Sequence, residues 1–390
     1  MSLRSKKRPS IEPYWYLIGG LLLIVFILFI SHLVTGKTPN RAIFTIPILD
    51  FDVYWYGIAI VGGIALGSYV VSKLAEERAV RLFLKEVPLK VRKRPLSSLK
   101  LPRETVKKLG KRKMTTVGDL LLQWGYDPRY LGLDSDELER VEGALTAVKG
   151  ISADWLTDAP WRIWNPDHTW NGVMWGVIFG IIGARLYHIL TPSPSMGITV
   201  LEYITDPARM LDFRNGGLGI YGGIAGGLLG ISIYTRRQKI PFLGWADLAV
   251  IGMALGQVFG RWGNFFNQEL YGKPTTVPWA ITIDHPLPAF AEYSTFHPAF
   301  LYESLWNLLA FAILYTLNRR YSRRLLTGDL LALYLILYAV GRVLLETTRL
   351  DSRMVSIGDM QLNMAIATLL SIIIAVLMAV WRLVAHRHNK

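Results

Sequence analysis

About eight apolar runs, each close to the roughly 20 residues that an α-helix needs to cross the hydrocarbon core of a bilayer, constrain this chain most. The expected spans are 14–35, 53–74, 172–190, 217–234, 246–265, 298–317, 330–346 and 362–384. Hydrophobic residues make up 52% of the 390 residues, which argues against a purely soluble globule. The pattern predicts an all-α polytopic integral membrane protein with about eight transmembrane helices.

The first apolar run follows a basic N-terminus, as the core of a signal peptide would. Its apolar part is too long and no small-residue cleavage site follows, so we interpret it as an uncleaved anchor helix. Basic residues gather at 236–239, 319–324 and 382–390, whereas 266–297 is almost without lysine or arginine. Because basic loops favour the cytoplasmic side, we predict that both termini are cytoplasmic and that 266–297 lies outside.

A long polar insertion divides the chain into four parts. We assign 1–50 to the basic N-terminus, anchor helix and outer linker, 51–74 to the first core helix, 75–170 to a cytoplasmic helical module and 171–390 to the remaining core. The basic residues of the module either attract anionic lipid or form a solvated linker; they are Lys90, Arg92, Lys93, Arg94, Lys107, Lys108, Lys111, Arg112 and Lys113. The stretch 109–122 faintly resembles a helix-hairpin-helix module. The membrane explains the net charge of +14 more simply, so we expect no nucleic-acid partner.

Ionisable side chains interrupt the span at 330–346. Tyr338, Arg342, Glu346 and Arg349 follow one another at spacings of four, four and three, which places them along one helix face. Such residues in hydrocarbon are costly unless they are paired or face a wet cavity, so they are functional candidates. The alternative is an Arg342–Glu346 pair that neutralises itself, which leaves Tyr338 and Arg349 unexplained.

The segment 260–272, GRWGNFFNQELYG, is the densest polar site. It gathers Arg261, Asn264, Asn267 and Glu269 at the outer end of a span, between glycines that allow close backbone approach. Irregular backbone at membrane depth is tolerated only where it is buried in protein or lines a water-filled cavity, so the segment indicates a cavity. The alternative is an ordinary loop that caps a helix.

Other polar positions are weaker candidates. Glycines four apart in 216–230 predict close helix packing, with Tyr221 projecting into the enclosed space. Two further polar groups each contain a single histidine: Arg185 with His188, and His297 with Tyr302 and Glu303. A lone histidine in such a position is more often structural than catalytic. Arginines beside a membrane cavity suit a phosphate, because a guanidinium stays charged and binds two oxygens at once, which favours an anionic phospholipid substrate. The chain has no cysteine, so any thiol must come from a partner.

At this point the motifs resemble those of the bacterial prolipoprotein diacylglyceryl transferases. The likeness begins near 51 and omits the insertion; its segments are WYGIAIVGG, GARLYHIL, GGLGIYGGIAGG, GRWGNFFNQELYG, HPAFLYE and YAVGRVLLETTRLD. The resemblance implies that the anchor helix and the insertion are additions that do not touch the chemistry. By position in the matching motifs, it implies that activity depends on Tyr56, Arg261, Asn264, Glu269, Gly272, Tyr338, Arg342 and Glu346.

Three further positions are expected to bind substrate, namely Asp247, His297 and Tyr221. Asp247 lies fourteen residues before Arg261, as the aspartate of the family does. Tyr221 stands where many members of the family have histidine, and a tyrosine with an ordinary pKa near roughly 10 is a poor base at neutral pH. The identity of the general base therefore stays open.

The reaction that the resemblance implies moves the sn-1,2-diacylglyceryl group of phosphatidylglycerol to the lipobox cysteine of a prolipoprotein, in the bacterial inner membrane. Arg261 and Arg342 would hold the phosphate, and Glu346 would orient Arg342. Glu269 or a phosphate oxygen would accept the thiol proton, and Tyr56 and Asn264 would bind headgroup or peptide. The expected partners are phosphatidylglycerol, prolipoprotein signal peptides and membrane lipids, with no cofactor and no metal. The alternative is a lipid or anion transporter that uses the same arginines.

Overall fold

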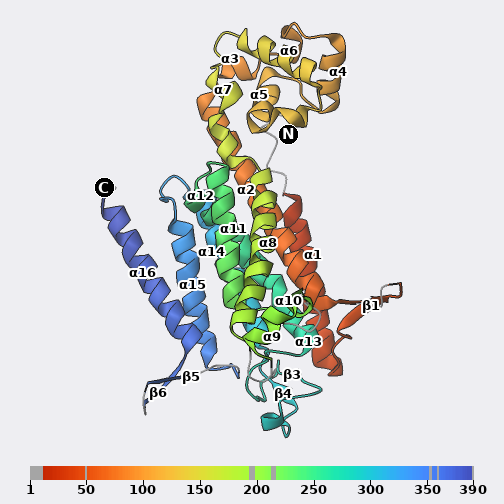
Figure 1. Ribbon diagram of the computed structural model, residues 1–390, viewed down its shortest axis with the longest axis vertical. Helices are drawn as coiled ribbons and strands as arrows, with labels where there is room; N and C mark the ends of the chain where they lie inside the picture. Colours follow the sequence, from red (N-terminus) through yellow and green to blue (C-terminus); the bar gives the residue numbers. More distant parts are fainter. Residues whose placement is uncertain are drawn as a thin grey trace. The chain divides into compact units, whose positions relative to one another are not determined.

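The computed structural model describes residues 12–48, 51–192, 198–211, 217–350, 354–357 and 360–388, so the basic residues before 12 lie outside the described part. Long helices dominate (Figure 1): α1 (Pro13–Thr35), α2 (Trp55–Glu86), α8 (Asp167–Leu190), α11 (Ile220–Arg237), α12 (Phe242–Gly260), α14 (Ala299–Arg320), α15 (Asp329–Glu346) and α16 (Ile366–His388). Five described segments have the length and hydropathy of a bilayer span, namely α1, α2, α8, α14 and Phe242–Asn267. The all-α membrane class is confirmed, but the number eight is not.

Short elements make up the rest of the regular structure in the described residues. The helices among them are α3 (Leu89–Arg92), η1 (Leu96–Ser98), α4 (Arg103–Lys111), α5 (Val117–Tyr126), η2 (Pro128–Leu131), α6 (Ser135–Thr146), α7 (Asp154–Thr157), η3 (Pro160–Trp164), α9 (Val200–Thr205), α10 (Pro207–Leu211), α13 (Trp262–Asn267) and η5 (Pro288–Phe290). Three antiparallel hairpins are formed by β1 (Ala42–Ile46) with β2 (Phe51–Tyr54), β3 (Ile281–Thr282) with β4 (Thr295–Phe296), and β5 (Met354–Ile357) with β6 (Met360–Ala365).

Several boundaries differ from the prediction by up to five residues, and the end of α2 differs by more. The helix expected to end at 74 continues to Glu86, because the intervening residues are mostly good helix formers and Pro88 follows shortly after its end. The last helix begins at Ile366 rather than 362, because β6 occupies the preceding residues.

The chain forms two compact units, one of residues 72–242 and one of 11–71 with 243–390. In the first, the insertion is a small helical module built around the end of α2. Phe83 of α2 and Trp161 of η3 are fully buried, with ring centroids 4.9 Å apart. Leu109 and Leu120, on α4 and α5, belong to the same buried cluster. The module therefore has its own apolar core.

Glycines bring α8 and α11 into backbone contact within this unit. A Cβ atom on Gly230 would lie 2.6 Å from the carbonyl oxygen of Trp175, and one on Gly226 would lie 3.1 Å from Cα of Gly183. No larger residue fits at these positions without moving a backbone. The close packing predicted from the glycine spacing is thus present.

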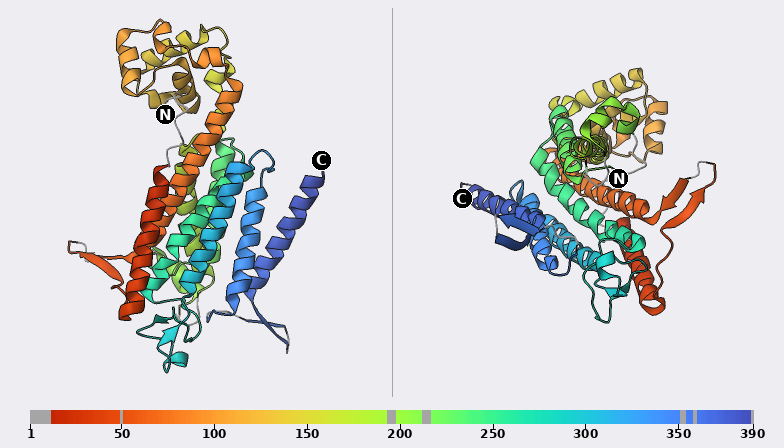
Figure 2. Two further views of the ribbon diagram at one scale, coloured as in Figure 1. Left: turned by 180° about the vertical axis from the view of Figure 1, so that it is seen from behind. Right: turned by 60° about the horizontal axis from the view of Figure 1, so that its bottom comes forward.

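The second unit is arranged around α12, most of which is buried. Gly63 and Gly67 of α2 meet α12, since a Cβ on Gly63 would lie 2.7 Å from the Gly256 carbonyl oxygen. On another side Trp306 of α14 donates a hydrogen bond to the Leu337 carbonyl of α15 at 2.9 Å. α15 and α16 lie side by side in both orientations of the molecule (Figures 1 and 2), and Arg382 pairs with Asp329 at 2.7 Å.

Aromatic residues close one end of this second unit. Phe29 of α1, Trp262 of α13 and Phe300 of α14 form a buried cluster with edge-to-face rings. The β1–β2 hairpin follows α1 and stands away from the helices in both views of Figure 2. The segment predicted to carry the chemistry, 260–272, lies at this end.

Candidate active site

Arg261 lies where α12 ends and α13 begins, and a carboxylate of α14 holds it. Its Nε donates to Oε2 of Glu303 at 2.6 Å, while Arg349 forms an ion pair with the other oxygen of the same carboxylate. The Glu303 and Arg349 side chains are only 12% and 7% exposed, whereas Arg261 is 28% exposed. One glutamate thus orients two arginines, and Arg261 is the more accessible of the pair.

Arg342 adds a further cation to this unit. It lies on α15, and its buried Nε has no hydrogen-bond partner among the described residues. The predicted partner Glu346 ends the same helix, but the hydrogen bond on its Oε2 comes from Thr368 of α16 at 2.7 Å. Tyr338 lies one turn before Arg342 and is 41% exposed. The expected role of Arg342 in binding phosphate stays a prediction.

The loop after α13 gives Glu269 a defined position through unusual backbone angles. Gln268 and Leu270, on either side of it, have φ values of 52° and 51°. Such left-handed angles are uncommon outside glycine and are found at functional sites. Inside the loop, Glu269 donates its backbone N–H to the carbonyl of the buried Asn264 at 3.1 Å, and Asn267 donates to its side chain at 3.3 Å.

Gly272 closes the loop against two other segments. Its N–H donates to the His297 carbonyl at 2.9 Å, and it forms an isolated bridge with Arg349. A Cβ here would lie 2.6 Å from the carbonyl oxygen of Thr348, so a side chain cannot fit. His297 is itself held, since its Nδ1 lies 3.0 Å from the Tyr302 hydroxyl. Gly272 and His297 therefore help to fix the loop, and their expected roles at the site stay predictions.

A cleft of about 990 Å³ opens beside Glu269. Tyr56, at the start of α2, lines it and packs its ring against Gly263 of α13. Polar side chains from three segments line its rim: Arg41, Asp52, Tyr56, Asn267, Gln268 and Glu269. Ile58 and Val61 of α2 form an apolar wall.

The anchor helix α1 packs against this region. Its buried His32 accepts a hydrogen bond on Nε2 from the Thr282 N–H at 3.1 Å, and its ring meets that of Phe265. The expectation that α1 takes no part in the chemistry stays a prediction. The linker after α1 then supplies Arg41 to the cleft.

Asp247 is not part of the site. It is buried near the start of α12, where its two carboxylate oxygens accept the N–H groups of Gly328 at 2.7 Å and Leu331 at 2.9 Å. Fourteen residues of helix separate it from Arg261, which is about 21 Å at 1.5 Å per residue. Asp247 caps the N-terminus of α15, so the expected substrate contact is replaced by a structural one.

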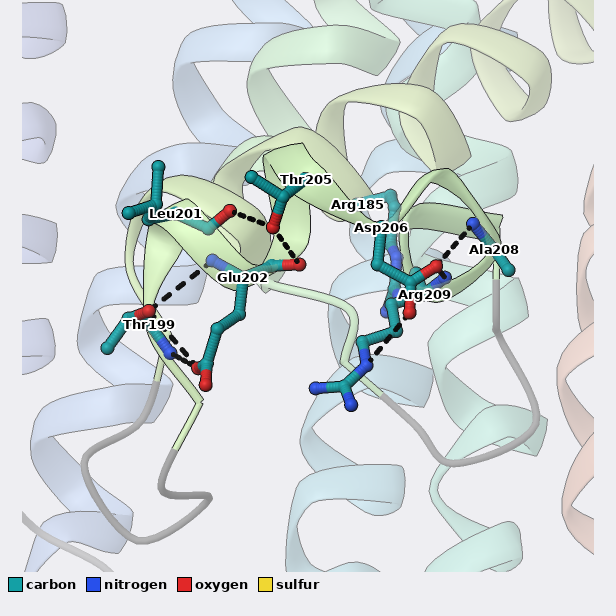
Figure 3. Close-up of polar contacts among 8 residues, drawn as sticks. All are labelled: Arg185, Thr199, Leu201, Glu202, Thr205, Asp206, Ala208 and Arg209. Atoms are coloured by element: carbon teal, nitrogen blue, oxygen red, sulfur yellow. Dashed lines mark hydrogen bonds and ion pairs between the residues drawn. The ribbon is translucent and has the colours of Figure 1, made fainter.

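The remaining polar candidates lie in the unit of residues 72–242. Arg185 of α8 is 6% exposed and donates to the carbonyls of Arg209, Met210 and Gly217, which ties α10 to α8. Figure 3 shows Arg185 beside Arg209, together with the Thr199–Glu202 capping box that begins α9. His188 contacts the Tyr203 hydroxyl at 3.0 Å. These side chains serve the fold.

Tyr221 lies near the start of α11 in that same unit. It is 55% exposed, and its ring centroid is 6.0 Å from that of Tyr187. The exposed ring can contact a ligand, so its assignment to substrate binding stays a prediction.

Apolar helices, together with two arginines paired with one buried carboxylate, define a polytopic membrane protein with a cationic cluster. No cluster of histidines and carboxylates suited to a metal occurs in the described part of the chain. A sequence model of the prolipoprotein diacylglyceryl transferases matches residues 142–383, more than half of the chain. The chain belongs to the prolipoprotein diacylglyceryl transferase family.

Curated relatives agree with this membership. A phosphatidylglycerol–prolipoprotein diacylglyceryl transferase of Chloroflexus aggregans is 39% identical over 243 residues, which are 58% of this chain and 77% of that protein. A protein of the same name from Frankia alni is 48% identical over 178 residues, which are 46% of each chain. The second such transferase of Streptomyces coelicolor is 43% identical over 188 residues, 47% of this chain and 57% of the relative.

Sequence reasoning missed two residues at the site. Glu303 was weighed only as a weak neighbour of His297, although Arg261 has no acidic neighbour close in sequence, which indicates a distant carboxylate. Arg41 lies before the region of family likeness, so no motif marks it.

Proposed function

We propose that this chain transfers the sn-1,2-diacylglyceryl group of phosphatidylglycerol to the lipobox cysteine of prolipoproteins, forming a thioether and releasing glycerol phosphate. The observation that carries the proposal is the Arg261–Glu303–Arg349 cluster, which lies within the part of the chain that matches the family. Family membership supplies the reaction, and the cluster supplies groups suited to it.

The arginines suit the departing phosphate. When the bond between the glyceryl carbon and the phosphate oxygen breaks, the electron pair stays on that oxygen and its negative charge grows. Arg261, oriented by Glu303, and Arg342, with an unpartnered Nε, would stabilise this charge electrostatically. Both guanidinium groups can offer two parallel hydrogen bonds to phosphate oxygens.

The cysteine must lose a proton before it attacks. A thiol with an ordinary pKa of about 8.5 is mostly protonated at neutral pH, and the apolar setting of a membrane disfavours the thiolate further. Asp52 and Glu269 both line the cleft near Tyr56, and Glu269 lies in the part of the chain that matches the family, so we assign it as the proton acceptor. The thiolate then forms the carbon–sulfur bond as the carbon–oxygen bond breaks.

We also propose that the protein resides in the bacterial cytoplasmic membrane with both termini inside, since the basic loops favour this orientation. The absence of cysteine makes a clean test possible. Lys37→Cys should react with an impermeant thiol reagent added outside intact spheroplasts, and Lys239→Cys should react only after lysis. The reverse pattern would refute the orientation.

Purified protein incubated with phosphatidylglycerol and a lipobox peptide tests the activity directly. We expect a peptide heavier by one diacylglyceryl group and an equal amount of glycerol phosphate, with Arg261→Ala as the inactive control. Movement of intact phospholipid across vesicles without any peptide modification would instead identify a transporter.

A further inference from the structure

Two polar regions in the unit of residues 11–71 and 243–390 carry opposite formal charge. The arginine region, formed by Arg261, Arg349 and Glu303, holds two arginines against one glutamate, which leaves one positive charge in excess. The cleft rim contains Arg41 against Asp52 and Glu269, which leaves one negative charge in excess. A phosphate headgroup is therefore attracted to the first region and disfavoured at the second.

The cleft also changes from polar to apolar along α2. Tyr56 lies at the polar rim, and Gly62 lies six residues further along the helix, about 9 Å at 1.5 Å per residue. Ile58 and Val61 are exposed between them, at 47% and 67%. No heavy atom lies within 4 Å of a Cβ placed on Gly57 or Gly62, so another backbone can approach this wall closely.

The rim residues are held in place by the hairpin that precedes α2. Asp52 accepts a hydrogen bond from Thr45 across the two strands at 2.5 Å, and the backbone carbonyl of Arg41 accepts the Trp55 N–H at 3.1 Å. The backbone of Arg41 is thus fixed at the start of α2. Its exposed guanidinium has no recorded partner within the described residues and offers five N–H donors to a ligand.

We infer that this cleft holds the polypeptide substrate rather than the phospholipid headgroup, and that Arg41 is a specificity-determining residue for the segment that follows the cysteine. The inference rests on the proposed function. An apolar signal-peptide segment would lie against Ile58 and Val61, its cysteine would reach Glu269, and the polar chain beyond it would pass Arg41. The lipid would approach from the arginine region, so the two substrates would not compete for one surface.

The test compares Arg41→Glu with Lys37→Glu, which makes the same charge change four residues away at an exposed position that does not line the cleft. Transfer is measured with two lipobox peptides that carry Glu or Lys directly after the cysteine. We expect Arg41→Glu to lower kcat/KM for the Glu peptide about tenfold more than for the Lys peptide, as for one lost charge-assisted hydrogen bond. Lys37→Glu should leave the ratio unchanged.

A second measurement separates the substrates. When the mole fraction of phosphatidylglycerol in mixed micelles is varied, its KM should be the same in Arg41→Glu as in the wild type. Arg41→Gln should lower the peptide ratio, which is kcat/KM for the Glu peptide divided by kcat/KM for the Lys peptide, to a value between those of the wild type and Arg41→Glu. A raised KM for phosphatidylglycerol with an unchanged peptide ratio would assign the cleft to the headgroup and overturn the inference. An equal change of the peptide ratio in Lys37→Glu would show that general surface charge, and not Arg41 itself, causes the preference, which would also overturn the inference. Wild-type protein without any transfer would refute the proposed function itself.

Discussion

Arg261 donates to Glu303 across 2.6 Å, from the segment after α12 to the first turns of α14. This ion pair sets the direction of the arginine that we assign to the phosphate. It also joins two parts of the chain that are more than forty residues apart, so the site depends on how α14 packs.

Replacing the carboxylate while keeping its shape should expose that dependence. In Glu303→Gln both arginines lose their shared anion, and Arg261 is no longer held toward the phosphate. We expect kcat to fall about 100-fold, as for a reacting group misplaced by about 1 Å, while the KM for the peptide changes little. Steady-state transfer in micelles measures this, with thermal unfolding to exclude misfolding. Wild-type kcat in a folded variant would remove Glu303 from this role.

Lysine at position 261 should not restore activity. It keeps the charge but lacks the planar guanidinium that binds two oxygens at once. We expect Arg261→Lys to lower kcat by a larger factor than it raises the KM for phosphatidylglycerol, because only contacts stronger in the transition state accelerate the reaction. Arg342→Lys should behave alike. A purely raised KM would make Arg261 a headgroup anchor only.

Asp247 should matter for stability and not for turnover. Its removal in Asp247→Ala leaves two N–H groups of α15 without their acceptor, and the loss of such a cap costs roughly 1–2 kcal/mol. Thermal unfolding should shift downward, whereas kcat per folded molecule should stay within twofold of the wild type. Asp247→Asn keeps one acceptor, so its unfolding temperature should lie between those of the wild type and Asp247→Ala. A deep loss of kcat at normal stability would instead assign Asp247 to the active site.

Gly272 and Gly260 form a matched pair for testing backbone approach. A Cβ at Gly272 would meet the Thr348 carbonyl at 2.6 Å, whereas one at Gly260 would meet nothing within 4 Å. We expect Gly272→Ala to displace the loop and lower transfer at least tenfold, a cost typical of an overpacked contact. Gly260→Ala should be close to neutral in the same assay. Equal effects would show that the close contact between Gly272 and Thr348 does not limit transfer.

We expect that changing the charge of the helical module leaves transfer intact. Deletion of 85–113 cannot test this independence. That segment supplies Val87, Val91, Leu96, Leu99 and Leu109 to the buried core, so its removal should unfold the module. Combined Lys107→Gln, Lys111→Gln and Lys113→Gln changes affect exposed side chains and should leave in vitro transfer within twofold. A large loss of turnover in the folded triple variant would connect the module to the reaction.

The sequence was a good guide to elements that follow from local chemistry. Apolar runs predicted the long helices to within a few residues at most ends, because the bilayer demands about 20 apolar residues whatever the tertiary fold. Glycines four apart predicted close packing of the helix at 217–234, since only small residues let two backbones meet, and the structure identifies α8 as the partner.

Long-range contacts were harder to predict. The spacing of Arg342 and Glu346 suggested a pair, whereas Thr368 of another helix binds the glutamate, and Glu303 binds the arginine at 261. Asp247 was assigned to the substrate by its distance in sequence from Arg261, although a helix carries it about 21 Å away. In each case the deciding partner lies on an element whose neighbours a single sequence does not reveal.

The left-handed backbone of Gln268 and Leu270, on either side of Glu269, lowers the stability of the fold while it fixes the direction of the carboxylate that we assign to catalysis. Holding Leu270 at a positive φ costs roughly 1–2 kcal/mol, which glycine at that position would relieve. The relaxed loop would let the carboxylate sample many directions, so a variant selected for yield or heat resistance would drift toward a weaker proton acceptor. Engineering of this protein for robustness should therefore leave residues 268–270 untouched.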